Sequence, residues 1–385
     1  MKNVFLKLIK VAILGETMPL EISELKTAEN LKSVFSLAKK HDLAHLVADA
    51  LEKLNLLPID DKLKTKFLKE RNLAVYRNEI NDYELERISV AFKGEKVPFI
   101  ALKGSVIKNY YPEPWMRTSC DVDILVEPTK LDLATEILTN NLGYVVTSKG
   151  DHDVSFKTPS KAHIELHYKL FDSDAKKQEK ALFENVFSLS KLTKNSATYY
   201  EMPNEYFYAY HISHIAKHLR FGGCGVRAIL DTYVLNNCLT FDETLKANLL
   251  EKAGLTTLAS NIENLSKAWF GNGEENDVTS RLSEYILTGG IYGTFETKIK
   301  AQQSKKSSKF SYLLSRIFLP YSQLKFKYPK LEKYPILYPY YIVKRWFSLL
   351  NKNKRELAVR EYTNVTKTEN SSQEEVKKLL DDLNI

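Results

Sequence analysis

Apolar residues follow two different spacings along this chain, and the change between them marks its organisation. Over residues 1–93, and again over residues 173–299, they recur at helical intervals with breaks at turn residues. Residues 97–170 instead carry short apolar runs of strand length, separated by turn residues and a helical segment. The pattern predicts an α+β protein in which an α/β core, built on a small mixed sheet, is flanked by N- and C-terminal helical regions.

The same pattern divides the chain into four parts. We expect an N-terminal helical region over residues 1–95 and the α/β core over residues 96–172. A helical domain over residues 173–300 is expected to complete the cleft. The last part, residues 301–385, is expected to begin with a Lys/Ser-rich linker, residues 301–311, and to continue as a helical, basic and aromatic segment.

The core is expected to alternate strands, turns and helices. Its predicted elements are a strand over residues 97–102, a turn at Lys103-Gly104-Ser105, a short helix from Val106, a strand over residues 121–126, a helix over residues 129–140, a strand over residues 144–147, and a hairpin with strands over residues 154–157 and 162–169. A helix between strands requires a crossover, so the sheet is expected to be mixed.

The turn Lys103-Gly104-Ser105 directly follows an apolar strand and begins a helix. Glycine lets the backbone turn sharply and approach a ligand closely. Ser105 can cap the helix or hold a phosphate oxygen, and a helix N-terminus favours anions. The turn is therefore a candidate phosphate site.

Asp121 and Asp123 lie within an apolar run that predicts a buried strand. Because side chains alternate along a strand, the two carboxylates share one face. Unpaired carboxylates side by side repel each other and resist burial, so this arrangement needs a cation. Mg²⁺, or Mn²⁺, is the natural candidate, since such ions bind carboxylate oxygens together with substrate phosphates.

Glu165 lies on a later predicted strand, where it shares a face with His163 and His167. It can complete a carboxylate triad with Asp121 and Asp123, and two metal ions held by such a triad can stabilise the attacking and leaving oxygens of a phosphoryl transfer. A rival interpretation makes the two histidines and Glu165 a zinc or iron site. It is disfavoured because neighbouring residues on one strand face diverge too little to surround one ion.

A second informative stretch covers residues 206–235. His211, His214 and His218 share one face of a predicted helix, and Lys217 stands beside them. For His214 and His218 a ligand-facing role and a structural role are equally supported. For His211 the structural role is favoured.

Glycines at positions 222, 223 and 225 end that helix, and Arg227 and Asp231 follow four residues apart on the next one. In the functional interpretation Lys217, His218 and Arg227 face a triphosphate or an acceptor across the cleft. In the structural interpretation Arg227 and Asp231 form an ion pair within their helix.

Composition narrows the class of protein. The 385 residues are 44% hydrophobic and 27% charged, which is typical of a soluble globular protein with room for two domains. The net charge of +8 suits an anionic ligand, but the basic residues are scattered, so nucleic acid is not expected as a partner. Three cysteines without a CxxC spacing indicate a reducing compartment, and we expect a cytoplasmic protein.

Two apolar stretches were considered as membrane segments. Lys7 and Lys10 interrupt the N-terminal run at helical spacing, which predicts an amphipathic helix and not a signal peptide. The aromatic stretch at residues 334–350 is broken by prolines and is too short to span a bilayer, although a peripheral membrane contact there stays open. His41 and His45, four apart on a predicted N-terminal helix, are interpreted as surface histidines.

Gly104-Ser105, followed by Asp121-x-Asp123 and by Glu165 on a later strand, resembles the polymerase-β-type nucleotidyltransferase superfamily. More narrowly, the chain resembles a bacterial family of uncharacterised nucleotidyltransferases. The shared features are an LKG, a YP, an arginine shortly before the DxD (Arg117), and an ELH. The resemblance is tightest over residues 97–170 and looser over residues 30–240.

The resemblance implies an enzyme that moves a nucleoside monophosphate from an NTP to a hydroxyl of an acceptor, with release of pyrophosphate. Asp121, Asp123 and Glu165 would be the catalytic residues and the ligands of Mg²⁺ or Mn²⁺, and Glu165 could also act as general base. Nucleotide binding would fall to Lys103, Gly104, Ser105, Arg117, Lys217, His218 and Arg227.

Two alternatives remain. One is a non-catalytic nucleotide-binding module that engages a protein partner, and the other is a template-independent nucleotidyltransferase acting on RNA ends. Nothing in residues 170–385 identifies the acceptor as a small molecule, a sugar or a protein. The choice of NTP and the oligomeric state are equally unreadable.

Overall fold

The structure is a computed structural model, and it describes most of the chain up to residue 290 and parts of the C-terminal region. The described residues are 1–15, 25, 27–172, 175–194, 196–290, 317–321, 324, 325, 328, 330–348, 355, 356 and 370–385. The predicted linker at residues 301–311 lies outside the described residues.

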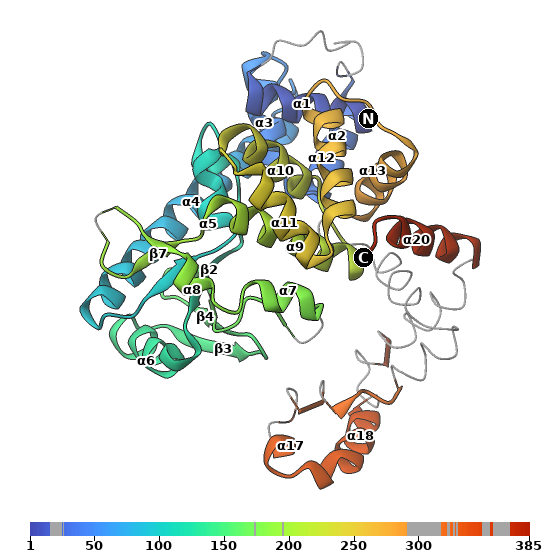
Figure 1. The fold of residues 1–385 in the computed structure, drawn as a ribbon. Coiled ribbons are helices and arrows are strands. Elements are labelled where there is room, and N and C mark those ends of the chain that lie inside the picture. Colours follow the sequence, from blue (N-terminus) through green and yellow to red (C-terminus); the bar gives the residue numbers. More distant parts are fainter. Residues whose placement is uncertain are drawn as a thin grey trace.

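Seven strands of the described chain form one mixed sheet in the order β3-β4-β5-β2-β1-β7-β6. The sheet lies in the lower left of Figure 1. Their bounds are β1 Phe99–Ala101, β2 Asp121–Val126, β3 Val145–Lys149, β4 Asp153–Lys157, β5 His163–His167, β6 Lys191–Leu192 and β7 Tyr199–Glu201. The expected α+β class with a mixed sheet is confirmed. β6 and β7 were not predicted, because strands of two and three residues carry no readable period.

The centre of the sheet fixes the positions of the acidic residues. β2 and β5 pair in parallel, with Asp123 beside Glu165 and Leu125 beside His167. β1 pairs with β2 in the antiparallel sense and with β7 in parallel. Because successive side chains alternate, Asp121, Asp123 and Leu125 all lie on one face of β2.

Each face of the sheet has its own hydrophobic core. Val122, Ile124 and Val126 pack in one core with α6 (Leu131–Glu136) and with the C-terminal part of α4 (Asp61–Gly94). The opposite face contributes Ile100, Leu102 and Leu125 to a larger core, which is shared with the helical parts of the chain. The acidic face of β2 therefore looks toward helices.

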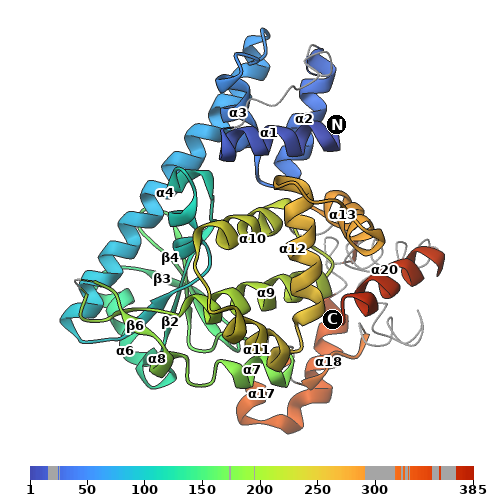
Figure 2. The ribbon, with the colours of Figure 1, turned by 45° about the horizontal axis from the view of Figure 1, so that its top comes forward.

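Those helices surround the larger core, and Figure 2 shows α4 along one side of the molecule with α9 to α12 on the other. The bounds of the helices in this core are α1 Lys2–Leu14, α2 Ala28–Lys40, α3 Ala44–Lys53, α5 Gly104–Ile107, α7 Lys177–Leu182, α8 Val186–Leu189, α9 Asn204–Arg220, α10 Val226–Cys238, α11 Glu243–Ala253, α12 Thr256–Phe270, α13 Asp277–Gly289 and α20 Asn370–Asp382. Two further helices, α17 Lys330–Lys333 and α18 Tyr338–Phe347, pack in a separate small hydrophobic cluster. None of the described helices has the length and apolar character needed to cross a membrane.

His41 and His45 are buried, so their interpretation as surface histidines was wrong. His41 caps the end of α2, where Nδ1 accepts a hydrogen bond from the Val226 amide at 3.3 Å and Nε2 lies 3.3 Å from the Leu287 carbonyl oxygen. The His45 Nε2 donates to the Met116 carbonyl at 2.8 Å. Both rings tie the N-terminal helices to the rest of the molecule.

Candidate active site

The turn after β1 connects this strand to α5 and is hydrogen-bonded to β2. The Leu102 amide donates to the carbonyl of Asp123 at 2.9 Å, so the turn stays attached to β2. Lys103 then adopts φ 45° and ψ −117°, a conformation that L residues rarely take, and α5 begins at Gly104. A Cβ at Gly104 would lie 2.4 Å from Nη1 of Arg117 and 2.8 Å from Oγ of Ser119. Gly104 is therefore closely covered by these two side chains.

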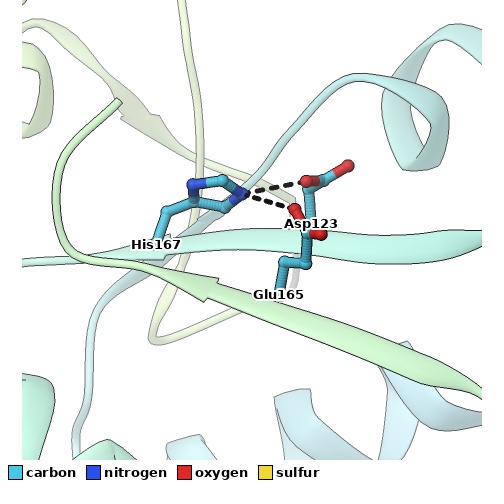
Figure 3. A group of neighbouring side chains, drawn as sticks. All are labelled: Asp123, Glu165 and His167. Carbon is cyan, nitrogen blue, oxygen red and sulfur yellow. Dashed lines mark hydrogen bonds and ion pairs between the residues drawn. The ribbon is translucent and has the colours of Figure 1, made fainter. Parts of the chain in front are cut away.

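Asp123 is the centre of a compact polar cluster (Figure 3). Its Oδ1 lies 2.8 Å from Nζ of Lys103 and 2.9 Å from Nε2 of His167, and the same nitrogen lies 3.5 Å from Oε2 of Glu165. Burial favours the neutral acid, but Lys103 and His167 outweigh it and hold the pKa of Asp123 well below its ordinary value. Burial also opposes the charge of His167, yet its bonds to the two carboxylates raise its pKa.

Asp121 shares the face of Asp123 and accepts a hydrogen bond from Oγ of Ser119 at 3.1 Å. Burial, with the negative charges of Asp123 and Glu165, raises its pKa to about 6. The three carboxylates are therefore close enough to repel one another. Negative charge accumulates here beyond what Lys103 compensates.

The cluster has the atoms of a metal site. The ligand atoms of Asp123, Glu165 and His167 all lie within 4.8 Å of one another. His163 is exposed and is not part of this group, so the rival site built on both strand histidines does not form among the described residues. The group thus contains two of the three carboxylates predicted as metal ligands, Asp123 and Glu165, together with the nitrogen of His167, and it does not include Asp121.

A cavity of about 240 Å³ opens on this cluster between the sheet and the helices α9 and α10. It is lined by Lys103, Ile107, Arg117, Ser119, Cys120, Asp121, Asp123, Phe207, Tyr210, His211, His214, Ile215, His218, Cys224, Gly225, Arg227, Ala228 and Asp231. Four predicted site residues, namely Gly104, Ser105, Glu165 and Lys217, are not in its wall. Gly104 and Ser105 are buried behind it, while Lys217 forms an ion pair with Asp172 at 2.8 Å.

Arg117 is held in the wall of the cavity by Asp231. Nη2 and Nε of Arg117 lie 2.9 Å and 3.3 Å from the two carboxylate oxygens, and the hydroxyl of Tyr111 donates to Asp231 at 2.7 Å. Burial favours the neutral acid, but Arg117 outweighs it and lowers the pKa of Asp231. The pair fixes a guanidinium beside the acidic cluster.

Arg227 has different partners from those predicted. Its Nη1 lies 3.2 Å from Oδ2 of Asp42 and donates to the carbonyl of Thr118 at 2.9 Å. The ion pair between Arg227 and Asp231, which was the structural interpretation of these residues, does not form, because Arg117 occupies the carboxylate of Asp231. A loop residue outcompetes the neighbour on the same helix.

All three histidines of α9 lie in the wall of the cavity. The Nε2 atoms of His214 and His218 lie 2.9 Å apart at the cavity wall. Burial and the charge of Lys103 lower both pKa values, that of His218 to about 4, so both rings are neutral at pH 7. His211 is buried against Oγ1 of Thr232 at 2.9 Å, which fits the structural role.

Several residues of the site were missed in the sequence. Tyr210 lines the cavity and lies four residues before His214, so it shares a helix face with both neutral histidines. That spacing is a signal that could have identified it. Asp42 and Thr118, which hold Arg227, carry no such signal because they come from loops far apart in the sequence.

The comparisons with known proteins agree with this geometry. A family model described as an uncharacterised nucleotidyltransferase matches residues 27–271. The matched range contains the turn, both carboxylate strands and the helices α9 and α10. No curated protein and no solved structure matches the chain.

Proposed function

Because this chain belongs to the family of uncharacterised nucleotidyltransferases, we propose that it moves a nucleoside monophosphate from an NTP to a hydroxyl of an acceptor, with release of pyrophosphate. The observation that carries the proposal is the pairing of Asp123 with Glu165 on parallel strands, beside the turn at Lys103 and Gly104. Asp121 completes the acidic face. This is the residue set that phosphoryl transfer with a divalent ion needs.

The residues fit a divalent metal ion. The raised pKa of Asp121, caused by burial and by the two neighbouring carboxylates, indicates an excess of negative charge that a cation would relieve. Asp121, Asp123 and Glu165 offer the oxygen ligands that Mg²⁺ and Mn²⁺ prefer, and His167 offers a nitrogen that Mn²⁺ accepts. A bound ion would polarise the phosphoryl oxygens and neutralise the charge that develops on them.

The protein side chains have separate tasks in this proposal. Arg117 and Arg227 line the cavity with fixed positive charge for the polyphosphate, and His214 and His218 add neutral N–H donors. The Glu165 side chain is 33% exposed, so it is the carboxylate that an incoming acceptor can reach. We assign to it the proton of the acceptor hydroxyl.

The turn at Lys103-Gly104-Ser105 can bind phosphate only if a side chain that covers it moves away. Gly104 and Ser105 were expected to hold the β- and γ-phosphates, but Arg117 and Ser119 cover Gly104 in this structure. A phosphate that reaches the amide of Gly104 must therefore displace one of these side chains. Arg117 itself is the natural partner of that phosphate once it moves.

Incubation of the pure protein with each α-³²P-labelled NTP, with Mg²⁺ or Mn²⁺ and cell lysate, tests the proposal. Asp123→Asn should reduce label transfer by about a thousandfold or more, since it removes a carboxylate of the cluster. Asp132→Asn, on the exposed side of α6, is the matched control and should transfer label like wild type. The labelled fraction identifies the acceptor as small molecule, protein or RNA.

Wild-type turnover in Asp123→Asn would overturn the assignment. Metal-dependent binding of the NTP without label in any fraction would favour the non-catalytic nucleotide-binding module. Label on RNA ends would favour the template-independent polymerase.

A further inference from the structure

A second cavity, of about 520 Å³, lies at the end of β2 that follows the acidic residues. It is lined by Leu125, Val126, Pro128, Asp151, Tyr168, Lys169, Leu170, Phe171, Asp172, Lys180, Phe183, Glu184, Val186, Phe187 and Lys325. Its volume lies in the range of small-molecule sites. None of these residues was singled out for a binding role in the sequence.

The two cavities follow each other along the central strands. On β2, Asp121 and Asp123 line the first cavity, while Leu125, two residues further on the same face, lines the second. Two residues of strand span about 7 Å. On β5, His167 belongs to the acidic cluster and the next residue, Tyr168, lines the second cavity. The cluster therefore lies at the first cavity, and along both strands the second cavity begins within two residues of it.

Tyr210 forms the partition between them. Its side chain lines the first cavity, and its ring centroid lies 6.0 Å from that of Phe171 and 6.1 Å from that of Phe183, both of which line the second. Phe171 and Phe183 also contact each other, at 5.4 Å. One aromatic group thus connects the polar cavity to an apolar one.

On the basis of the nucleotidyl transfer proposed above, we propose that the second cavity binds the acceptor, and that the acceptor is a neutral small molecule with a flat apolar body and a hydroxyl group. Phosphoryl transfer requires the attacking oxygen and the leaving pyrophosphate to lie roughly in line across the α-phosphorus. The polyphosphate is assigned to the first cavity, where Arg117 and Arg227 lie in the wall, so the attacking hydroxyl must come from the far side of the cluster. The second cavity lies on that side.

The chemistry of the wall defines the class of acceptor. Aromatic rings of Tyr168, Phe171, Phe183 and Phe187 offer flat apolar contact surface. The charged residues of the wall are three acids (Asp151, Asp172 and Glu184) and three lysines (Lys169, Lys180 and Lys325), so no net charge selects an ion. The four aromatic rings favour a flat apolar body over a sugar, and an RNA end would need a cationic groove.

The reaction balances with the residues present. The acceptor oxygen forms a bond to the α-phosphorus, the bond from that phosphorus to the pyrophosphate oxygen breaks, and the hydroxyl proton passes to the carboxylate of Glu165. Glu165 is half-buried and lies in the wall of neither cavity, so it receives this proton from the side of the acidic cluster, where its Oε2 lies 3.5 Å from Nε2 of His167.

Binding of 2-naphthol, measured by saturation-transfer NMR without any NTP, tests the proposal. Its anionic analogue 6-hydroxy-2-naphthalenesulfonate and glucose serve as comparison probes. Phe171→Ala removes one wall and should weaken 2-naphthol binding about tenfold, while Phe171→Trp should weaken it by narrowing the cavity. Phe35→Ala, a matched half-buried phenylalanine on α2, should leave the binding unchanged.

The same variants should bind Mg·ATP like wild type. The proposal is overturned if 2-naphthol does not bind, if it binds Phe171→Ala and wild type equally, or if glucose or the sulfonate binds better. It is also overturned if Phe171→Ala weakens Mg·ATP and not 2-naphthol, because the cavity then holds the nucleobase. Since the probe is measured without NTP, its failure is distinct from a failure of label transfer in the Asp123→Asn experiment.

Discussion

Replacing Asp231 by leucine should lower the free energy of unfolding by about 3–5 kcal/mol, because it leaves the guanidinium of Arg117 buried without the carboxylate to which it is hydrogen-bonded. The two side chains are 3% and 9% exposed and are joined by two hydrogen bonds. The hydroxyl of Tyr111 also loses its acceptor, which adds about 1 kcal/mol. Against a total stability of about 5–15 kcal/mol, this loss is large.

The reverse variant, Arg117→Met, should respond differently to pH. In wild type the pKa of Asp231 is lowered mainly by Arg117, against burial, so the stability of the pair is fully present above the unfolded pKa of about 4. Without Arg117, burial raises the pKa of Asp231, and the carboxyl can take up a proton as the pH falls. The deficit of Arg117→Met should therefore shrink between pH 7 and pH 5. The deficit of Asp231→Leu should not, because arginine keeps its proton.

Urea unfolding followed by circular dichroism at pH 7 and pH 5 measures both effects. The double variant, Asp231→Leu with Arg117→Met, should lose less free energy of unfolding than the two single variants lose together, because it leaves neither charge of the pair without its partner. Asp277→Leu is the control, since Asp277 is 87% exposed in its pair with Arg281 and should cost at most about 1 kcal/mol. A loss below about 1 kcal/mol for Asp231→Leu, or strict additivity in the double variant, would refute the reasoning.

Two further predictions concern other contacts of the same region. Burial lowers the pKa of His41 to about 4, whereas the unfolded side chain titrates near 6.5. The contribution of His41 to the free energy of unfolding is therefore constant above about pH 6.5 and falls by about 3 kcal/mol as the pH is lowered toward 4. Urea unfolding of wild type and His41→Leu over this pH range should show a smaller fall in the variant, and an equal fall would contradict the assignment. Gly104→Ala places a Cβ against Arg117, so label transfer should drop about tenfold. Gly94→Ala is the control, because a Cβ at Gly94 meets open space, and this variant should transfer label like wild type. Equal activity of the two variants would contradict the close contact at Gly104.

Local alternation was enough to predict the acidic face. The DVDILV run specifies a strand with one polar and one apolar side, and the HIELH run does the same, so each carboxylate could be assigned to a face from its neighbours alone. The family resemblance rested on the same residues and is confirmed. The parallel pairing of the two strands, with Asp123 beside Glu165, could not be predicted from this alternation and is known only from the structure.

Ion pairs between residues far apart in the sequence could not be predicted from local spacing. Helical spacing says that Arg227 and Asp231 can meet, but it carries no information about Arg117 or Asp42, which arrive from loops and form the actual ion pairs. His45 was assigned to the surface although Leu46 and Val47 beside it are apolar. Its burial follows from α3 being covered on most sides, which only the packing of several helices decides.

The parallel pairing of β2 with β5 also constrains when the site can exist during folding. Parallel neighbours need a crossover, here through α6 and the strands β3 and β4, so the contact between Asp123 and Glu165 closes a long loop and belongs to the slow, non-local steps of folding. A nascent chain that has not yet docked β5 already has the turn and the two aspartates but lacks Glu165 and His167. The acidic cluster is therefore complete only once β5 has paired with β2, so a partly folded chain should not consume nucleotide in the reaction proposed above.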